Sequence, residues 1–130
     1  MKILICGGRN FNDYKMLEET INMHIEVNKI FFLNDNVEIV SGCALGADRL
    51  AIKFANKHCL LVKKFPANWD KFGKSAGYIR NKEMAQYLCD SKDTCKVIAF
   101  WDGVSKGTKN MIEISKKLNL DWKIYYYGHT

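Results

Sequence analysis

Three short stretches of the sequence combine glycines with residue types that bind anions. They are Gly7-Gly8-Arg9, Ser41-Gly42-Cys43-Ala44-Leu45-Gly46-Ala47-Asp48 and Asp102-Gly103-Val104-Ser105-Lys106-Gly107-Thr108. Glycine allows a backbone to approach an anion closely, and the free amides at the start of a helix point at it with a favourable dipole. One such turn is weak evidence, because loops between strands and helices need glycine for steric reasons alone. The sequence contains three such turns, and two of them include a basic residue. Together they favour an anionic ligand.

The chain has only three arginines, the residue type best suited to bidentate contacts with phosphate or carboxylate groups. Arg9 lies in the first glycine-rich stretch, and Arg80 opens a predicted helix, where Asn81 follows it. We predict that Arg9, Arg80 and Asn81 contact the ligand. Arg49 lies one turn into another predicted helix, and we expect it at the surface or in a salt bridge.

Two carboxylates and a group of aromatic side chains accompany these basic residues. Asp48 and Asp102 could each accept a hydrogen bond from a ribose hydroxyl or take part in acid–base chemistry. Trp69, Phe72 and Tyr78 could cover a base, and Trp69 could equally pack its segment onto the helices. These side chains are further candidates for contacting the anionic ligand.

The usual nucleotide-binding motifs are absent. The P-loop pattern G-x-x-x-x-G-K-[ST] is not matched, because Lys106 precedes Gly107 rather than following it. Gly7-Gly8 does not continue as the dinucleotide fingerprint G-x-G-x-x-G. The sequence therefore supports neither an ordinary NTPase nor a nicotinamide dehydrogenase.

The elements that position these residues follow from the alternation of apolar runs and helical patterns. Glycines or polar turns separate the runs, and Asn34-Asp35-Asn36 interrupts the first helical pattern, whose start Asn12 or Asp13 can cap. The segment 66–75 is predicted to be a loop, and Thr108 is predicted to cap the last helix. Strands are expected at 2–6, 37–40, 60–65, 97–101 and 122–127, and helices at about 14–33, 45–55, 77–88 and 108–118.

This order predicts one domain over residues 1–130, with an open, parallel, five-stranded Rossmann-like sheet and helices on both faces. The strands are apolar enough to be buried on both sides. In such sheets, ligands bind at the carboxyl ends of the strands. The three glycine-rich stretches all follow predicted strands, so we expect them to converge there.

Charge and composition narrow the partners. The formal net charge is +6, from 20 basic and 14 acidic residues, which favours anionic partners. Among anionic partners, nucleic acid is less favoured than a nucleotide, because the lysines are spread over nearly every element. No run approaches the ~18 apolar residues of a membrane helix. The five cysteines and three histidines form no metal-binding or disulfide pattern, so we expect no metal.

Four stretches together resemble one known family: Gly7-Gly8-Arg9, Ser41 to Asp48, Arg80 to Met84 and Gly103 to Thr108. They are similar to the SLOG superfamily, a Rossmann-like group named for the Smf/DNA-processing protein A and LOG ("Lonely guy") proteins. Within it, the chain most resembles the small YspA/YpsA-related proteins of bacteria and their phages, over essentially its whole length. The resemblance implies a nucleotide-type ligand and a homo-oligomer. No cofactor is expected to be required, because the charge of Arg9, Arg80 and Lys106 could suffice. The short apolar run at the N-terminus shows no signal-peptide pattern, so a cytoplasmic location is expected by default, in the bacterial host if the protein is phage-encoded.

The LOG branch of this superfamily hydrolyses the N-glycosidic bond of nucleoside monophosphates through a P-G-G-x-G-T-x-x-E motif and an arginine. Gly107-Thr108 matches the G-T of that motif and Arg80 lies in the arginine stretch, but the glutamate position falls on Met111. Glu113 is rotated by about 200° around the helix and cannot simply replace it. Arg80, Asp48 and Asp102 remain as candidate catalytic residues, and whether the protein is an enzyme stays open.

Three functions are therefore considered. The first is a domain that senses or sequesters a nucleotide or nucleotide-derived signal, and the alternatives are a LOG-like N-glycosidase and a DNA-binding protein of the DNA-processing protein A type. Trp69 and Tyr78 are the predicted base-stacking residues. The predicted ligand-binding residues are Gly7, Gly8, Arg9, Ser41, Gly42, Gly46, Ala47, Asp48, Arg80, Asn81, Asp102, Gly103, Ser105, Lys106, Gly107 and Thr108.

Overall fold

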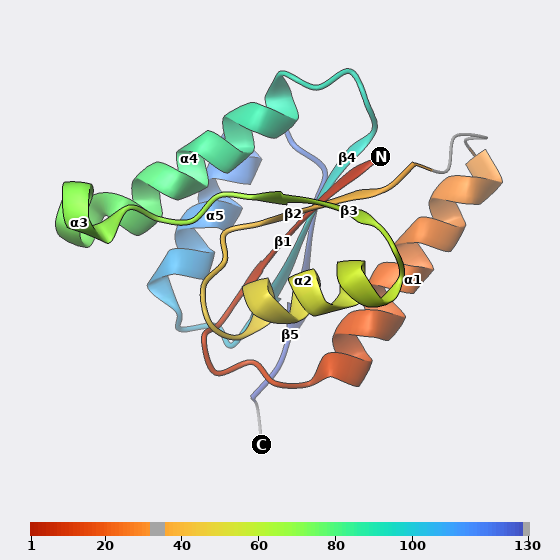
Figure 1. Cartoon of the computed structure of the whole chain (residues 1–130), viewed down its shortest axis with the longest axis horizontal. Coiled ribbons are helices and arrows are strands. Elements are labelled where there is room, and N and C mark those ends of the chain that lie inside the picture. The colour runs from red at the N-terminus through yellow and green to blue at the C-terminus, as the bar shows by residue number, and fades with distance from the viewer. Residues whose placement is uncertain (32–35, 129–130) are drawn as a thin grey trace.

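A single sheet of five parallel strands forms the centre of the computed structural model, which describes residues 1–31 and 36–128 (Figure 1). The strand order is β3-β2-β1-β4-β5, and each adjacent pair is parallel. The predicted parallel α/β fold is thus confirmed. The strands are β1 (Lys2–Gly7), β2 (Glu38–Ser41), β3 (Leu61–Lys64), β4 (Cys95–Trp101) and β5 (Trp122–Tyr126).

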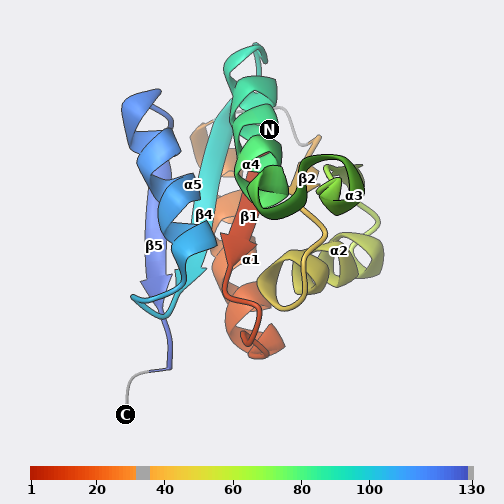
Figure 2. The ribbon, with the colours of Figure 1, turned by 90° about the vertical axis from the view of Figure 1, so that its left-hand side faces the viewer.

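Within residues 1–31 and 36–128, five α-helices connect these strands and cover both faces of the sheet. In Figures 1 and 2, α1 and α2 lie on one side of the sheet, and α4 and α5 lie on the other. The short α3 and a 3-10 turn at Gly73–Ser75 precede α4. The helices are α1 (Tyr14–Phe31), α2 (Ala47–Lys57), α3 (Trp69–Phe72), α4 (Ala76–Cys89) and α5 (Lys106–Lys117).

Side chains along the central strands point alternately to the two faces of the sheet, and a hydrophobic core lies on each face. Ile3 and Ile5 of β1 are fully buried against α1 and α2, where Phe54 is the largest buried side chain. Leu4, on the opposite face of the same strand, packs in the second core with Met84 of α4. This alternation is the period-two pattern of a strand, applied to a sheet that is covered on both sides.

Some predicted boundaries need correction. The segment 66–75, predicted as a loop, contains α3 and the 3-10 turn, because the Asn68 side chain accepts a hydrogen bond from the Lys71 amide and caps a helical turn. The last helix begins at Lys106 with Ser105 as its N-cap residue, so Thr108 lies inside the helix. Of the predicted helix-breaking Asn34-Asp35-Asn36, the first two positions lie outside the described residues.

The outer strands are not buried on both faces, contrary to the prediction. In β3, Leu61, Lys63 and Lys64 are exposed, because β3 is an edge strand. Lysines are common on such edges, where they discourage pairing with other chains. β5 forms the other edge and has only half-buried and exposed residues.

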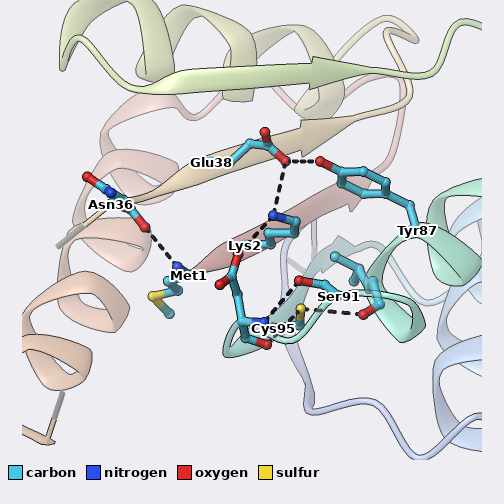
Figure 3. Close-up of polar contacts among 9 residues, drawn as sticks. Met1, Lys2, Asn36, Glu38, Tyr87, Ser91 and Cys95 are labelled. Atoms are coloured by element: carbon cyan, nitrogen blue, oxygen red, sulfur yellow. Dashed lines mark hydrogen bonds and ion pairs between the residues drawn. The ribbon is translucent and has the colours of Figure 1, made fainter. Parts of the chain in front are cut away.

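The amino-terminal ends of the strands are joined by side-chain contacts (Figure 3). The Lys2 ammonium lies 3.0 Å from Asp93 and 3.8 Å from Glu38, and the Tyr87 hydroxyl donates a hydrogen bond to Glu38. The amino group of Met1 donates to the Asn36 carbonyl at 2.7 Å. These contacts connect β1, β2 and the segment that precedes β4. They lie at the end of the sheet opposite to the predicted site.

No helix in the described part of the chain is long and apolar enough to cross a membrane.

Candidate functional site

The strand order places a topological switch point at the centre of the sheet. β1 and β4 are neighbours, with Gly7 opposite Phe100, yet β1 leads to α1 on one face and β4 leads to α5 on the other. The two connections therefore diverge, and a crevice forms at the carboxyl ends of the strands. A cavity of about 420 Å³ lies there, and we call it the main cavity. It is lined by Cys6, Gly7, Gly8, Arg9, Asn10, Ala44, Asp48, Trp69, Lys74, Gly77, Tyr78, Asn81, Met84, Asp102, Ser105, Gly107 and Thr108.

Gly7 and Gly46 are required by close packing rather than by ligand approach. A Cβ at Gly7 would lie 2.6 Å from both the Ala47 Cβ and the Phe100 carbonyl oxygen. A Cβ at Gly46, whose φ is +82°, would lie 2.2 Å from the Gly8 carbonyl oxygen. That carbonyl also accepts the Ala47 amide at 3.3 Å, so the loop after β1 sits directly on the start of α2.

The start of α5 is the open part of the cavity wall. Asp102 accepts hydrogen bonds from the amides of Val104 at 2.9 Å and Ser105 at 2.8 Å, which fixes the turn between β4 and α5. A Cβ at Gly107 would meet no atom within 4 Å. Amides in the first turn of a helix have no acceptor within the helix. The α5 terminus can therefore present amides and a positive dipole end to a bound anion.

Arg80 and Asn81 connect α4 to the neighbouring loops. The Arg80 guanidinium donates to the Gly42 carbonyl and, at 3.0 Å, to the Asn81 side-chain oxygen. The Asn81 amide group donates to the Gly107 carbonyl at 3.2 Å and to the Asn110 side-chain oxygen at 3.0 Å. Asn81 is buried, so its hydrogen bonds hold the start of α5 in place beside the cavity.

Asp48 is a buried carboxylate in the wall of the main cavity. Its side chain accepts the Ala44 amide at 3.2 Å, and its backbone carbonyl accepts the Ser41 hydroxyl at 2.8 Å. Burial raises the pKa of the Asp48 carboxyl to about 6, although the Arg80 and Arg9 charges favour the ionised form. A carboxyl group with a pKa of about 6 can exchange a proton under mildly acidic conditions, which makes Asp48 a candidate functional group.

Two aromatic side chains border the cavity and are each a little under half exposed to solvent. Trp69 of α3 is 48% exposed and Tyr78 of α4 is 43% exposed. The Arg9 guanidinium lies 5.8 Å from the Trp69 ring centre. Trp69 also lies across Gly77, where a Cβ would be 3.5 Å from the indole ring. Such flat, exposed rings are suited to stacking on a base.

Comparison with protein families agrees with the geometry. Residues 1–72, more than half of the chain, match the family described as YspA, cpYpsA-related SLOG family. The chain belongs to this SLOG family. Membership indicates a role in binding a small, nucleotide-related ligand.

The other comparisons add little. The solved structure of the C-terminal domain of a hydrogenase from Pyrococcus furiosus is 18% identical, with a TM-score of 0.48; the match covers 95% of this chain and 90% of that one. No curated protein matches.

Nine of the sixteen ligand-binding residues predicted for this SLOG protein line the main cavity, and both predicted stacking residues do too. The nine are Gly7, Gly8, Arg9, Asp48, Asn81, Asp102, Ser105, Gly107 and Thr108. The residues predicted but not lining it are Ser41, Gly42, Gly46, Ala47, Arg80, Gly103 and Lys106, of which Gly42 and Arg80 line a neighbouring hollow.

Sequence reasoning missed several cavity residues. Lys74 is polar and lies in the predicted loop 66–75, so its position was a usable signal. Cys6 and Met84 gave none, because a buried apolar residue beneath a cavity looks like any other core residue. Phe72, a third predicted aromatic, lines a different hollow with Glu83.

The position of the LOG glutamate is part of the core in this SLOG protein. Met111 is fully buried and packs with Leu4 and Met84. Glu113 lies on the exposed side of α5 and is 3.9 Å from Lys109. The carboxylates that line the main cavity are Asp48 and Asp102.

Proposed function

We propose that the protein binds a nucleotide or a nucleotide-derived signalling ligand in the main cavity, and senses or sequesters it. The observation that carries this proposal is the cavity itself. It lies at the switch point of the sheet and is lined by an open helix terminus, a buried carboxylate and two exposed aromatic rings. Its volume of about 420 Å³ falls within the range of small-molecule sites, roughly 300–1,000 Å³.

Each part of a nucleotide has a matching group in the cavity wall. The amides at the start of α5, beside Gly107, suit a phosphate, and Arg9 and Lys74 add positive charge. Asp48 suits a ribose hydroxyl, because a buried carboxylate gains from an additional donor. Trp69 and Tyr78 suit the base. With this much positive charge on the chain itself, binding requires no metal or other cofactor.

Replacing Gly107 with valine tests this placement. Nothing lies within 4 Å of a Cβ there, so the fold should accept the new side chain, while its bulk obstructs the approach of a phosphate to the helix terminus. Calorimetry with mono-, di- and cyclic nucleotides identifies the nucleotide that the unaltered protein prefers. We expect Gly107→Val to bind that nucleotide at least tenfold more weakly.

The matched control is Lys109→Val, which adds the same side chain two residues along the same helix, where the lysine is 61% exposed. Lys109→Val should bind as the unaltered protein does. Equal affinity of Gly107→Val and Lys109→Val, with both folded by thermal unfolding, would place the ligand elsewhere.

A second candidate function is hydrolysis of the N-glycosidic bond of a nucleotide. The observation that favours it is Asp48, a cavity carboxylate whose pKa is raised by burial to about 6, so that it could activate a water. Release of free base and ribose 5-phosphate from a nucleoside monophosphate, lost in Asp48→Asn, would support this function. Recovery of the nucleotide unchanged would leave binding as the activity.

A further inference from the structure

A second hollow adjoins the main cavity and contains every arginine of the chain. We call it the arginine pocket. Its volume is about 250 Å³. Arg9, Arg49 and Arg80 all line it, and the sequence holds no other arginine. The remaining lining residues are Gly42, Cys43, Ala44, Leu45, Pro66, Ala67 and Trp69.

The three arginines come from separate parts of the fold. Arg9 follows β1, Arg49 lies in the first turns of α2, and Arg80 lies in α4. Their convergence is therefore a product of the tertiary structure and not of local sequence. Guanidinium groups repel one another, so a fold that gathers three of them in one hollow is stabilised by an anion placed between them.

The arginine pocket supplies no such anion from its own lining, which includes no aspartate or glutamate. Among the described residues, no ion pair joins any of the three arginines to a carboxylate within 4.0 Å. The nearby acid is Asp48, which faces the main cavity; burial raises its pKa, and the charges of Arg80 and Arg9 offset that rise only in part. One buried carboxylate leaves most of the positive charge uncompensated.

Two of the arginines are held in place by contacts that leave part of the guanidinium available. Arg80 donates to the Gly42 carbonyl and to Asn81, which uses two of its five N–H groups. Arg9 rests near the Trp69 ring. A partly fixed guanidinium loses less side-chain entropy when it binds an anion.

The two cavities share one wall. Arg9, Ala44 and Trp69 line both of them. We propose that the arginine pocket binds a compact oxyanion, and that it holds a second anionic group of the ligand whose first phosphate lies at the start of α5. The ligand class is then a nucleotide with two anionic groups. This last step rests on the proposed function, whereas the oxyanion site does not.

Inorganic phosphate, compared with acetate, tests the oxyanion site directly. The side-chain Nε–Hε signals of the three arginines are followed by nuclear magnetic resonance while each anion is added at constant ionic strength. Saturable shifts of the arginine signals with phosphate support a phosphate site, and saturable shifts with acetate as well support a general oxyanion site. Signals that fail to saturate with either anion overturn the proposal.

Two variants separate the site from general charge. Arg49→Gln removes an exposed arginine that makes none of the hydrogen bonds above, so the fold should be retained. Its matched control is Lys53→Gln, with the same charge change one turn along α2 and outside the arginine pocket. We expect Arg49→Gln to weaken phosphate binding about tenfold or more, as the loss of a charge-assisted hydrogen bond does. Equal weakening by Lys53→Gln would overturn the proposal.

The nucleotide step has its own readout. The gain in affinity from adenosine 5′-monophosphate to the 5′-diphosphate and the 3′,5′-bisphosphate is measured in the unaltered protein and in Arg49→Gln. A gain that Arg49→Gln abolishes supports a two-anion ligand, and affinities that do not depend on the second phosphate overturn it. If phosphate shifts the arginines but no nucleotide binds, the oxyanion site stands and the proposed nucleotide function fails.

Discussion

Asp48 is the residue whose chemistry depends most on the fold. Its sequence context suggested only a carboxylate near a glycine turn, and the structure buries it between the main cavity and Arg80. Burial disfavours the charged form, and the two nearby arginines compensate only in part. The folded protein therefore holds a proton on Asp48 more tightly than the unfolded chain does.

This shift makes a prediction about stability. The folded pKa of about 6 is above the ordinary 3.8, so the free energy of unfolding falls as the pH rises from about 4 to above 6, by about 3 kcal/mol at roughly 1.4 kcal/mol per pKa unit. Asp48→Asn cannot ionise and should gain stability relative to the unaltered protein over that interval. Urea unfolding between pH 4 and 8 measures the difference, and a difference that stays constant with pH would contradict the assigned pKa.

The sequence identified the types of the candidate residues but not the structural role of each. Gly7 and Gly107 looked alike in sequence, as glycines that follow strands. The structure needs the first for close packing against Ala47 and leaves the second open to the cavity. Arg49 looked like an ordinary surface arginine, and it is exposed, but it also lines the arginine pocket. A sequence gives the type and spacing of such residues and not the neighbours that decide their function.

At the scale of elements, α1 and α2 are joined by a polar cluster at their exposed edge. Glu18 of α1 accepts hydrogen bonds from His58 and Lys57, each at 3.0 Å, at the end of α2. These bonds lower the pKa of Glu18 to about 2, and the bond from His58 has the larger effect. The cluster fixes the end of α2 whose other end carries Asp48.

Through Glu18, this cluster makes the stability of the protein depend on pH. The pKa of Glu18 in the folded protein is below its ordinary 4.5. The contribution of Glu18 to the free energy of unfolding is therefore present above about pH 4.5 and is lost as the pH falls toward 2. Glu18→Gln should be less stable at pH 7 and should lose less stability on acidification. Glu19→Gln, on the same helix beside Lys15, is the control. Thermal unfolding from pH 7 to 2 should separate the two variants, and identical profiles would contradict the role of Glu18.

The order of strands and helices could be predicted because each has a strong hydrophobic period. The segment 66–75 could not, because α3 is a single turn held by the Asn68 cap and by packing of Trp69 over Gly77, with no repeat for a pattern to detect. The exposure of β3 was also missed. Its apolar residues fit a central strand, and its place at the edge depends on the strand order.

At the scale of the whole molecule, the candidate site lies at one end of the sheet. The amino-terminal ends of the strands are closed by Lys2, Glu38 and Tyr87, and the carboxyl ends carry both cavities. The net charge of +6 suits an anionic ligand there. Self-association stays a prediction, for which the β5 edge, with Tyr126 55% exposed, is the surface to examine by sedimentation velocity.

The most direct test of the central claim is mass spectrometry of the small molecules released from the purified protein, followed by incubation with mono-, di- and cyclic nucleotides. We predict that the unaltered protein retains or rebinds a phosphate-bearing nucleotide and that Gly107→Val loses it. A protein that releases no nucleotide and binds none of the panel would contradict it.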